Sequence, residues 1–441
     1  MGGLVDRPDT AGLERTTMRR VARRLMPLIV VCYLIAYIDR SNVSIAALTM
    51  NQDIGLTAAA YGLGAGLFFV TYIIFEIPSN LALHRYGARR WIARIMITWG
   101  IVTACMALVV GEKSFYTVRL LLGAAEAGFT PGIIFYLAQW FPSRHRGRAM
   151  SRFYIGAALA TVIGAPLSGL VLDLDGLLHI AGWQWLFVIS ALPAVVLGFV
   201  VLYRFTDQPS QAHWLPAEQR AWLVDTMTRE QREVRSARKY SVMGALRNPG
   251  VLLLATFFFL YSFNSIGLTL WMPQVIKGTF GHPSNLETSL LTAVPYIFAV
   301  VFMLVVGRRI DRGGSHHLHM AVPMAAAAVL LVGSVMAGQS VAGFLLLAVS
   351  TGVAWSAVPA LWATATAFTS GIAAAAAVAL INSTANIAGL AVPPLIGRVH
   401  EATGTFVAPL IIIAVAMLVG AVVALVSARF TGRGGLARSA G

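Results

Sequence analysis

The chain has 441 residues, of which 58% are hydrophobic and only 12% are charged. A soluble domain carries about a quarter charged residues, so this composition excludes an ordinary soluble enzyme and indicates a protein that lies largely in a membrane. The net charge of +15 does not indicate a nucleic-acid partner, because the cationic residues are spread over short loops between apolar runs.

Twelve apolar runs follow one another along the chain, and each is close to the roughly 20 residues that cross a bilayer core. Backbone polar groups must be satisfied within each segment in lipid, so each run is predicted to be a helix. The predicted spans are 26–48, 59–81, 91–111, 115–139, 150–173, 183–204, 249–273, 288–307, 318–338, 341–366, 373–395 and 406–428. The sequence therefore predicts an all-α membrane protein with twelve transmembrane helices.

The distribution of Lys and Arg predicts the orientation of these spans. With the N-terminus inside, the inside segments hold 26 Lys and Arg residues, whereas the outside loops hold only Lys113, Lys277 and Arg398. The Arg-rich start of the chain leads directly into a full-length span and is interpreted as an uncleaved arm. We therefore expect both termini in the cytoplasm.

The longest connection between spans divides the chain into two halves. It is polar, mixed in charge, and has six spans before it and six after it. A short surface helix is expected within it, from Pro216 to Trp222. The predicted organisation is a cytoplasmic arm at 1–25, a six-helix bundle at 26–204, a cytoplasmic linker at 205–248, a second six-helix bundle at 249–428 and a cytoplasmic tail at 429–441.

Corresponding loops of the two halves repeat a pattern. Aligning Gly314 with Gly87 places Asp311 on His84 and Arg312 on Arg85 at equal spacing. Glycine permits a tight turn, and an acid followed by Arg can pair with a neighbouring helix end and hold one conformation. The hypothesis is a pair of gating loops, and the alternative is ordinary positive-inside charge. The residues assigned to these loops are Arg85, Gly87, Arg89, Gly307, Asp311, Arg312 and Gly314.

Two carboxylates within the spans are candidates for proton coupling. Asp39 lies about halfway along the first span and Glu126 about halfway along the fourth. An ionisable group at this depth costs several kcal/mol unless it is paired or faces water. Burial favours the protonated carboxyl and a nearby Arg favours the ionised one, so substrate binding can control proton release. The alternative is a pair of structural ion pairs, one of them between Glu126 and Arg119, which lies seven residues earlier on the same helical face.

Arg40 is the candidate for binding an anionic substrate, because a guanidinium fork matches a carboxylate. The alternative is that Arg40 only neutralises Asp39. Arg119 either holds Glu126 in place or is a second anion contact. Uncharged groups near mid-depth are Tyr37, Asn42, Tyr72, Tyr261, Asn264, Gln274, Ser356, Trp362, Asn382 and Asn386. Of these, Tyr72, Asn264, Trp362 and Asn382 are predicted to bind substrate, and hydrogen bonding between helices is the competing explanation.

Several segments carry a resemblance to a known family. They are Tyr37-Ile-Asp39-Arg40-Ser-Asn42, Phe75-Glu76-Ile-Pro78-Ser-Asn80, Arg94-Ile-Met-Ile-Thr-Trp99-Gly, Arg119-Leu-Leu-Leu-Gly-Ala-Ala-Glu126, Trp140-Phe-Pro, Gly164-Ala-Pro-Leu-Ser-Gly169, Gly182-Trp-Gln-Trp-Leu-Phe187 and Trp271-Met-Pro-Gln274. With them the chain resembles the major facilitator superfamily and, within it, the anion:cation symporter family, which includes the tartrate, sugar-acid and hydroxyphenylacetate transporters of bacteria. It departs from the common pattern at Asn80 and His84, and Ser190 stands where relatives commonly have Glu.

The resemblance implies the major facilitator fold, two six-helix bundles that rock around a central site. It also implies that the acids at Asp39 and Glu126 couple protons and that Arg40 binds the anion. The expected function is proton-coupled uptake of a small organic anion, with a hydroxylated carboxylate such as tartrate or a sugar acid as the leading class. The alternatives are an aromatic carboxylate, similar to hydroxyphenylacetate or phthalate, or an anion exchanger or uniporter without proton coupling.

The expected partners are the substrate anion, protons and the lipid bilayer of a bacterial inner membrane. No nucleotide is expected, because a Gly-x-x-x-x-Gly-Lys-Ser/Thr loop is absent from the sequence. Neither an enzymatic activity nor a cofactor is predicted. The cluster of His316, His317 and His319 lacks a convincing set of further ligands, so no metal is expected.

Overall fold

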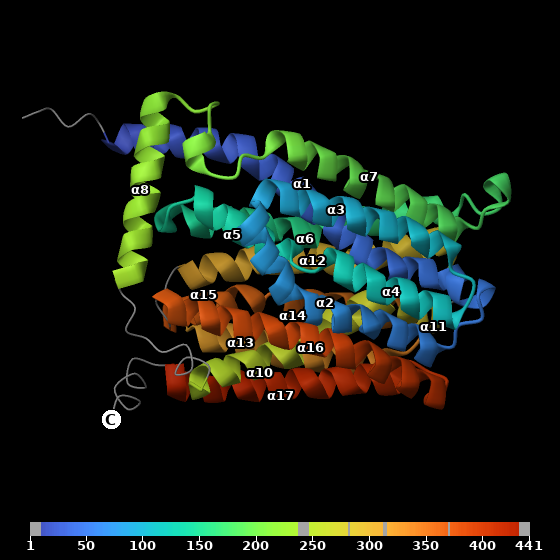
Figure 1. Cartoon of the computed structure of the whole chain (residues 1–441). Coiled ribbons are helices and arrows are strands. Elements are labelled where there is room, and N and C mark those ends of the chain that lie inside the picture. Colours follow the sequence, from blue (N-terminus) through green and yellow to red (C-terminus); the bar gives the residue numbers. More distant parts are fainter. Residues whose placement is uncertain (1–9, 237–246, 281–282, 312–314, 369–370, 432–441) are drawn as a thin grey trace, which may run out of the picture.

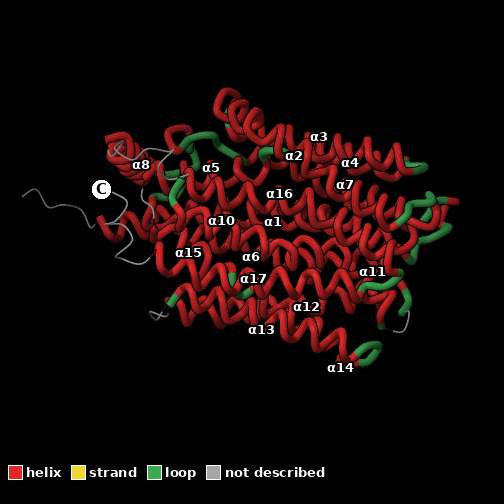
Figure 2. Tube along the Cα trace, turned by 90° about the horizontal axis from the view of Figure 1, so that it is seen from below, coloured by secondary structure: helices red, strands yellow, loops and turns green. Residues whose placement is uncertain are grey.

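The computed structural model of the chain describes residues 10–236, 247–280, 283–311, 315–368 and 371–431. Within these ranges the regular structure consists of helices, and no strand is present (Figure 2). This confirms the prediction of an all-α protein.

The helices that precede the long connection pack against one another through apolar faces. α1 packs on α6 and α7, α3 packs on α7, and α2 packs on α4. Their bounds are α1 Thr10–Asp53, α2 Ala58–Tyr86, α3 Ala88–Cys105, α4 Glu112–Glu126, α5 Phe129–Trp140, α6 Ser143–Leu172 and α7 Gly182–Arg204, with short 3₁₀ helices at η1 Met106–Leu108 and η2 Leu177–His179. The interior of this half is filled by large side chains such as Trp99 and Trp140, which are fully buried.

The helices that follow the long connection form a second group. α13 packs on α14 and α17, and α10 packs on α16 and α17. Their bounds are α10 Pro249–Ser262, a π-helical turn η4 at Phe263–Leu268, α11 Thr269–Thr279, α12 Asn285–Asp311, α13 His316–Ala337, α14 Val341–Trp355, α15 Val358–Phe368, α16 Gly371–Thr403 and α17 Val407–Thr431.

The connection itself contains a 3₁₀ turn, η3 Pro209–Gln211, and the helix α8 Ala217–Ser236, which is much longer than the predicted surface helix. α8 lies across one end of the molecule, where α1 begins and α17 ends (Figure 1). We call this end the α8 end and the other the opposite end. Leu223 and Met227 of α8 are buried, so α8 uses an apolar face to pack on its neighbours.

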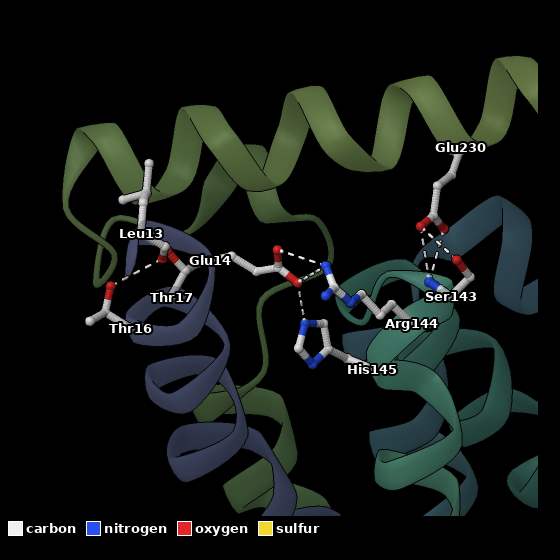
Figure 3. A network of polar contacts seen from close by, with 8 residues as sticks. All are labelled: Leu13, Glu14, Thr16, Thr17, Ser143, Arg144, His145 and Glu230. Carbon is white, nitrogen blue, oxygen red and sulfur yellow. Dashed lines mark hydrogen bonds and ion pairs between the residues drawn. The ribbon is translucent and has the colours of Figure 1, made fainter. Parts of the chain in front are cut away.

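Polar contacts also attach α8 and the start of α1 to the start of α6 (Figure 3). The Glu230 carboxylate on α8 accepts hydrogen bonds from the Ser143 backbone N–H at 3.0 Å and from the Ser143 hydroxyl at 2.9 Å. Glu14 on α1 lies 2.7 Å from His145 Nε2 and also pairs with Arg144. The first part of the connection therefore belongs structurally with the helices that precede it.

Eleven helices in the described part of the chain are long and apolar enough to cross a membrane. The remaining predicted span, 150–173, falls in α6, whose described apolar part is Leu159–Leu172. The outward faces of these membrane-spanning helices carry exposed apolar side chains, for example Ile77 and Leu81 of α2. Such faces are expected to contact lipid, so the prediction of a multi-span membrane protein is confirmed.

Four predicted spans are not the continuous α-helices that the sequence indicated. The third changes at Met106 from the α-helix α3 to the 3₁₀ helix η1. The fourth breaks at Ala127 and Gly128, where Gly128 adopts a φ of +87°. The seventh contains the π-helical turn at Phe263–Leu268, and the tenth breaks after Trp355. Apolar periodicity cannot reveal such local changes in backbone geometry, because the composition of the segment stays apolar through each break.

The two groups of helices touch where α1 meets α11, and their two most extensive contacts are α2 with α16 and α6 with α12. These two contacts join the second span to the eleventh and the fifth span to the eighth. In the six-span repeat the second span corresponds to the eighth and the fifth to the eleventh, so the two contacts are equivalent. Small residues allow the close approach. A Cβ atom on Gly62 would lie 2.5 Å from the Pro393 carbonyl oxygen, and one on Gly169 would lie 2.6 Å from Ser289 Cβ.

Candidate functional site

Arg40 and Glu126 form an ion pair between α1 and the end of α4. Arg40 Nε donates to Glu126 Oε1 at 2.6 Å, and the Glu126 side chain is only 1% exposed. Glu126 is the last residue of α4, immediately before the break at Ala127 and Gly128. The other carboxylate oxygen, Oε2, is buried and has no hydrogen-bond partner in the described ranges. This oxygen is a position that a proton could occupy.

Aromatic rings surround the Arg40 guanidinium. Its Cζ atom lies 5.2 Å from the ring centroid of Tyr72, 5.8 Å from that of Phe68 and 5.9 Å from that of Tyr37. At these distances each ring attracts the cation. Since the bond to Glu126 uses Nε and a guanidinium has four further N–H donors, Arg40 retains the capacity to bind another carboxylate.

Asp39 points to a different neighbour from Arg40, as expected for adjacent residues on a helix. Its Oδ2 accepts hydrogen bonds from Trp99 Nε1 at 2.9 Å and from the Thr103 hydroxyl at 3.0 Å, both on α3. Asp39 is buried, and its Oδ1 has no partner among the described residues. The interpretation that Arg40 serves only to neutralise Asp39 is not supported by this geometry, because the ion pair of Arg40 is with Glu126.

Arg119 does not pair with Glu126, although the two lie on one face of α4. It donates to the backbone carbonyls of Gly64 and Ala65 on α2, each at 3.2 Å, and its Cζ lies 5.0 Å from the Phe68 ring. The hypothesis of an Arg119–Glu126 ion pair is therefore wrong for this conformation. Spacing along a helix predicts a shared face, but it cannot reveal that carbonyl groups of the neighbouring helix compete for the guanidinium.

The second helix group brings uncharged polar atoms into the interior. Asn264 lies in the π-helical turn η4 and is fully buried, and neither atom of its amide has a partner in the part of the chain that the structure describes. The hydroxyl of Tyr261 and Nε1 of Trp355 are buried in the same way. A π-helical turn inside an α-helix is frequently found at functional sites, so these atoms are candidates for binding a polar ligand.

Aromatic contacts through Phe258 link Trp362, a predicted substrate contact, to Tyr261 and Trp355. Phe258 stacks on Tyr261 at 5.7 Å and packs edge-on against Trp362 at 5.5 Å, and Tyr261 lies 6.3 Å from Trp355. The sequence did not indicate Trp355 as a candidate ligand contact. The feature that distinguishes Trp355 is its place at the end of α14, next to a break that the sequence did not predict.

Asn382 and Asn386 lie one turn apart on α16. The Asn386 amide Nδ2 donates to Glu76 Oε2 on α2 at 3.3 Å, and Asn382 is half-buried one turn closer to the α8 end. This hydrogen bond places the Glu76 carboxylate between the two groups of helices.

Comparison with known proteins identifies the chain. Residues 29–393 match the Major Facilitator Superfamily. The chain belongs to the major facilitator superfamily. It is 45% identical over 424 residues, 95% of this chain and 93% of the relative, to a protein of Agrobacterium vitis named "Putative tartrate transporter". It is 40% identical over 407 residues, 92% of this chain and 94% of the relative, to the "Quinolone resistance transporter" of Acinetobacter baumannii.

The same fold is found in the inward open conformation of the xylose transporter XylE from E. coli. The TM-score is 0.72, the sequence identity is 14%, and the match covers 91% of this chain and 95% of that chain. The predicted major facilitator fold is therefore confirmed, and this major facilitator is a multi-pass membrane transporter.

The first predicted gating loop of this major facilitator is held within its own half of the molecule. Gly87 adopts a φ of +86°, and the backbone N–H of Arg89, in the first turn of α3, donates to Asp207 Oδ1 at 2.8 Å. Arg85 lies over the Tyr86 ring at 5.6 Å. A carboxylate at a helix N-terminus is favourable, and here it comes from the start of the linker. The first loop itself has His84 at the position where the second loop has Asp311.

The second predicted gating loop is described only in part. Gly307 and Asp311 lie in the last turns of α12, whereas Arg312 and Gly314 lie outside the described residues. No group of three or more His, Cys, Asp or Glu side chains that could hold a metal ion is found in the described ranges.

Proposed function

We propose that this major facilitator is a proton-coupled symporter that takes up a small organic anion, with a hydroxylated carboxylate such as tartrate or a sugar acid as its leading substrate class. The observation that carries the proposal is the ion pair between Arg40 and Glu126. Its Nε···Oε1 distance is 2.6 Å, and the Glu126 side chain is buried. This ion pair joins a cation suited to a substrate carboxylate with an acid suited to a proton.

The pair gives a simple basis for coupling. While Glu126 is ionised, its charge holds Arg40 and competes with any substrate anion for the guanidinium. A proton on Glu126 removes this competitor, and Arg40 can then bind the substrate carboxylate through two parallel N–H···O bonds. When the substrate leaves, Arg40 returns to Glu126 and favours loss of the proton. Proton and substrate are thus bound together and released together.

Asp39 is proposed as a second proton-coupling group. It is buried, and its described hydrogen-bond donors, Trp99 and Thr103, are uncharged. Burial without a cationic partner favours the protonated form of a carboxyl group. A proton on the unpartnered Oδ1 would give Asp39 an O–H donor while Oδ2 keeps its two hydrogen bonds.

The substrate class is supported by the buried polar atoms of the second helix group. The buried amide of Asn264 supplies both a donor and an acceptor, and Tyr261 supplies a hydroxyl. Buried polar groups without partners are costly, so a ligand with hydroxyl groups gains by pairing with them. Tyr72, Arg119, Trp362 and Asn382 are proposed as further residues that bind or position this ligand. The name of the Agrobacterium vitis relative refers to tartrate, which belongs to this class.

An aromatic carboxylate is the second candidate, and the rings near the site favour it. Tyr37 and Tyr72 lie beside Arg40, while Phe258 and Trp362 pack together in the other half. A third possibility is exchange or uniport without proton coupling, in which the Arg40–Glu126 pair is purely structural.

We also propose that the protein lies in a bacterial inner membrane with its α8 end in the cytoplasm. The support is the excess of Lys and Arg in the loops of this end. Under this proposal a reporter enzyme that is active only in the periplasm stays silent when fused after Gly441, and a strong signal would refute the orientation.

Uptake into proteoliposomes tests the function. Purified protein is reconstituted and assayed against a panel of hydroxylated and aromatic carboxylates, with and without an imposed inward proton gradient. Symport predicts accumulation above equilibrium that an uncoupler abolishes. Exchange without accumulation would support the rival mechanism, and no transport of any carboxylate would refute the substrate class.

A further inference from the structure

α2 and α16 pack closely against each other in the part of the molecule that lies away from α8, toward the opposite end. A Cβ atom on Gly66 would lie 2.8 Å from the Leu390 carbonyl oxygen, and one on Gly389 would lie 2.5 Å from the Phe69 ring. Outermost, Glu401 of α16 accepts a hydrogen bond from the Ala59 backbone N–H at 2.7 Å. We call this contact, between residues 58–76 of α2 and 386–401 of α16, the α2–α16 seam.

The hydrogen bond between Glu76 and Asn386 lies at the end of the α2–α16 seam that is nearer the α8 end. Beyond Glu76, the described hydrogen bonds and side-chain contacts of α2 are with its own half of the molecule. Ser79 donates to the Ala127 carbonyl at 2.7 Å, and the Leu83 side chain lies against Gly132. Glu76 therefore marks the point where α2 leaves α16 and joins α5.

Glu76 is also close to the proposed substrate site. It follows Tyr72 by one helical turn on the same face of α2, and the Tyr72 ring lies 5.2 Å from Arg40 Cζ. A displacement of α2 at Glu76 is therefore carried directly to the wall of the site.

We infer that the Glu76–Asn386 hydrogen bond is a joint that positions α2 against α16 while the two bundles move, so both are positioning residues for transport. The bond involves a carboxylate that is half-buried, which makes it stronger than a bond between two neutral groups. It lies where the packed seam ends, so it fixes the register of the two helices at the point where they diverge. The inference rests on the proposed transport function.

Two other roles for these residues make different predictions. Asn386 could bind the substrate itself, or Glu76 could carry a proton. Exchanging the carboxylate of Glu76 and the amide of Asn386 distinguishes the joint from these two other roles, because the exchange hardly changes the size of either side chain. Asn386→Asp places two carboxylates opposite each other. The double variant Glu76→Gln/Asn386→Asp restores one amide and one carboxylate with the wild-type charge, but with donor and acceptor reversed.

The joint predicts that Asn386→Asp lowers Tm in detergent by about 5 °C, since a repulsive contact replaces an attractive one, and slows substrate exchange at least tenfold. The double variant is expected to recover Tm to within about 1 °C and exchange to within threefold of wild type. Glu76→Gln alone is expected to retain gradient-driven accumulation, because its side-chain carbonyl can still accept from Asn386.

Three results would overturn the inference. If Asn386→Asp leaves Tm and exchange unchanged, the two side chains do not meet in the working protein. If the double variant stays as impaired as Asn386→Asp, Asn386 acts on the substrate. If Glu76→Gln abolishes accumulation but spares exchange, Glu76 carries a proton. The Tm readings need no substrate, so they test the joint even if none of the carboxylates is transported, a result that would count against the proposed function alone.

Discussion

Arg40 on α1 and Glu126 at the end of α4 are in direct contact, with 2.6 Å between Nε and Oε1, although 86 positions separate them in the chain. Glu126 is the last residue of α4, immediately before the break at Ala127 and Gly128. The Arg40 guanidinium, the cation of the proposed site, is paired with the buried carboxylate of Glu126.

Replacing Arg40 by Lys should weaken substrate binding at least tenfold while Tm changes little. Lys keeps the positive charge and can still pair with Glu126, but it lacks the planar fork that binds a carboxylate through two bonds. Binding is measured directly on purified protein by calorimetry. An unchanged Kd would remove Arg40 from the substrate site.

Arg119→Met should destabilise the protein and lower exchange and accumulation in parallel. Met fills a similar volume but removes the two hydrogen bonds that the guanidinium donates to the carbonyls of Gly64 and Ala65. The expected loss is about 2–3 kcal/mol of stability, in the range for hydrogen bonds to a charged group. The measurement is Tm together with the Kd of the substrate. A weaker Kd with unchanged Tm would instead make Arg119 a second contact for the anion.

Glu401→Ala should loosen the end of the α2–α16 seam that lies opposite α8. The carboxylate accepts from the Ala59 N–H in the first turn of α2, where a negative charge is favoured. In a background with Cys32 and Cys105 replaced by Ser, Ala58→Cys is labelled with a membrane-impermeant maleimide. The labelling rate is expected to rise severalfold when Glu401→Ala is added. An equal rate in both proteins would show that this contact does not keep the seam closed.

The sequence was sufficient for the order and approximate bounds of the eleven spans found in the described residues, because long apolar runs have few alternatives in a membrane. It also located the buried charges, since each is conspicuous in an apolar run. It could not assign their partners. Asp39 is held by Trp99 and Thr103, Arg119 by two backbone carbonyls, and Glu76 by Asn386 across the two groups of helices. These contacts depend on how helices rotate against one another, which no spacing within one helix records.

The central claim, that Glu126 couples proton to substrate through Arg40, is tested most directly by Glu126→Gln. Exchange and gradient-driven uptake are measured on one purified preparation of this variant. The neutral amide imitates the protonated acid, so exchange between two substrate-loaded compartments should continue while accumulation driven by a pH gradient is lost. Accumulation near the parental level would contradict the claim, and a joint loss of both activities with a lower Tm would show that the Arg40–Glu126 pair is structural.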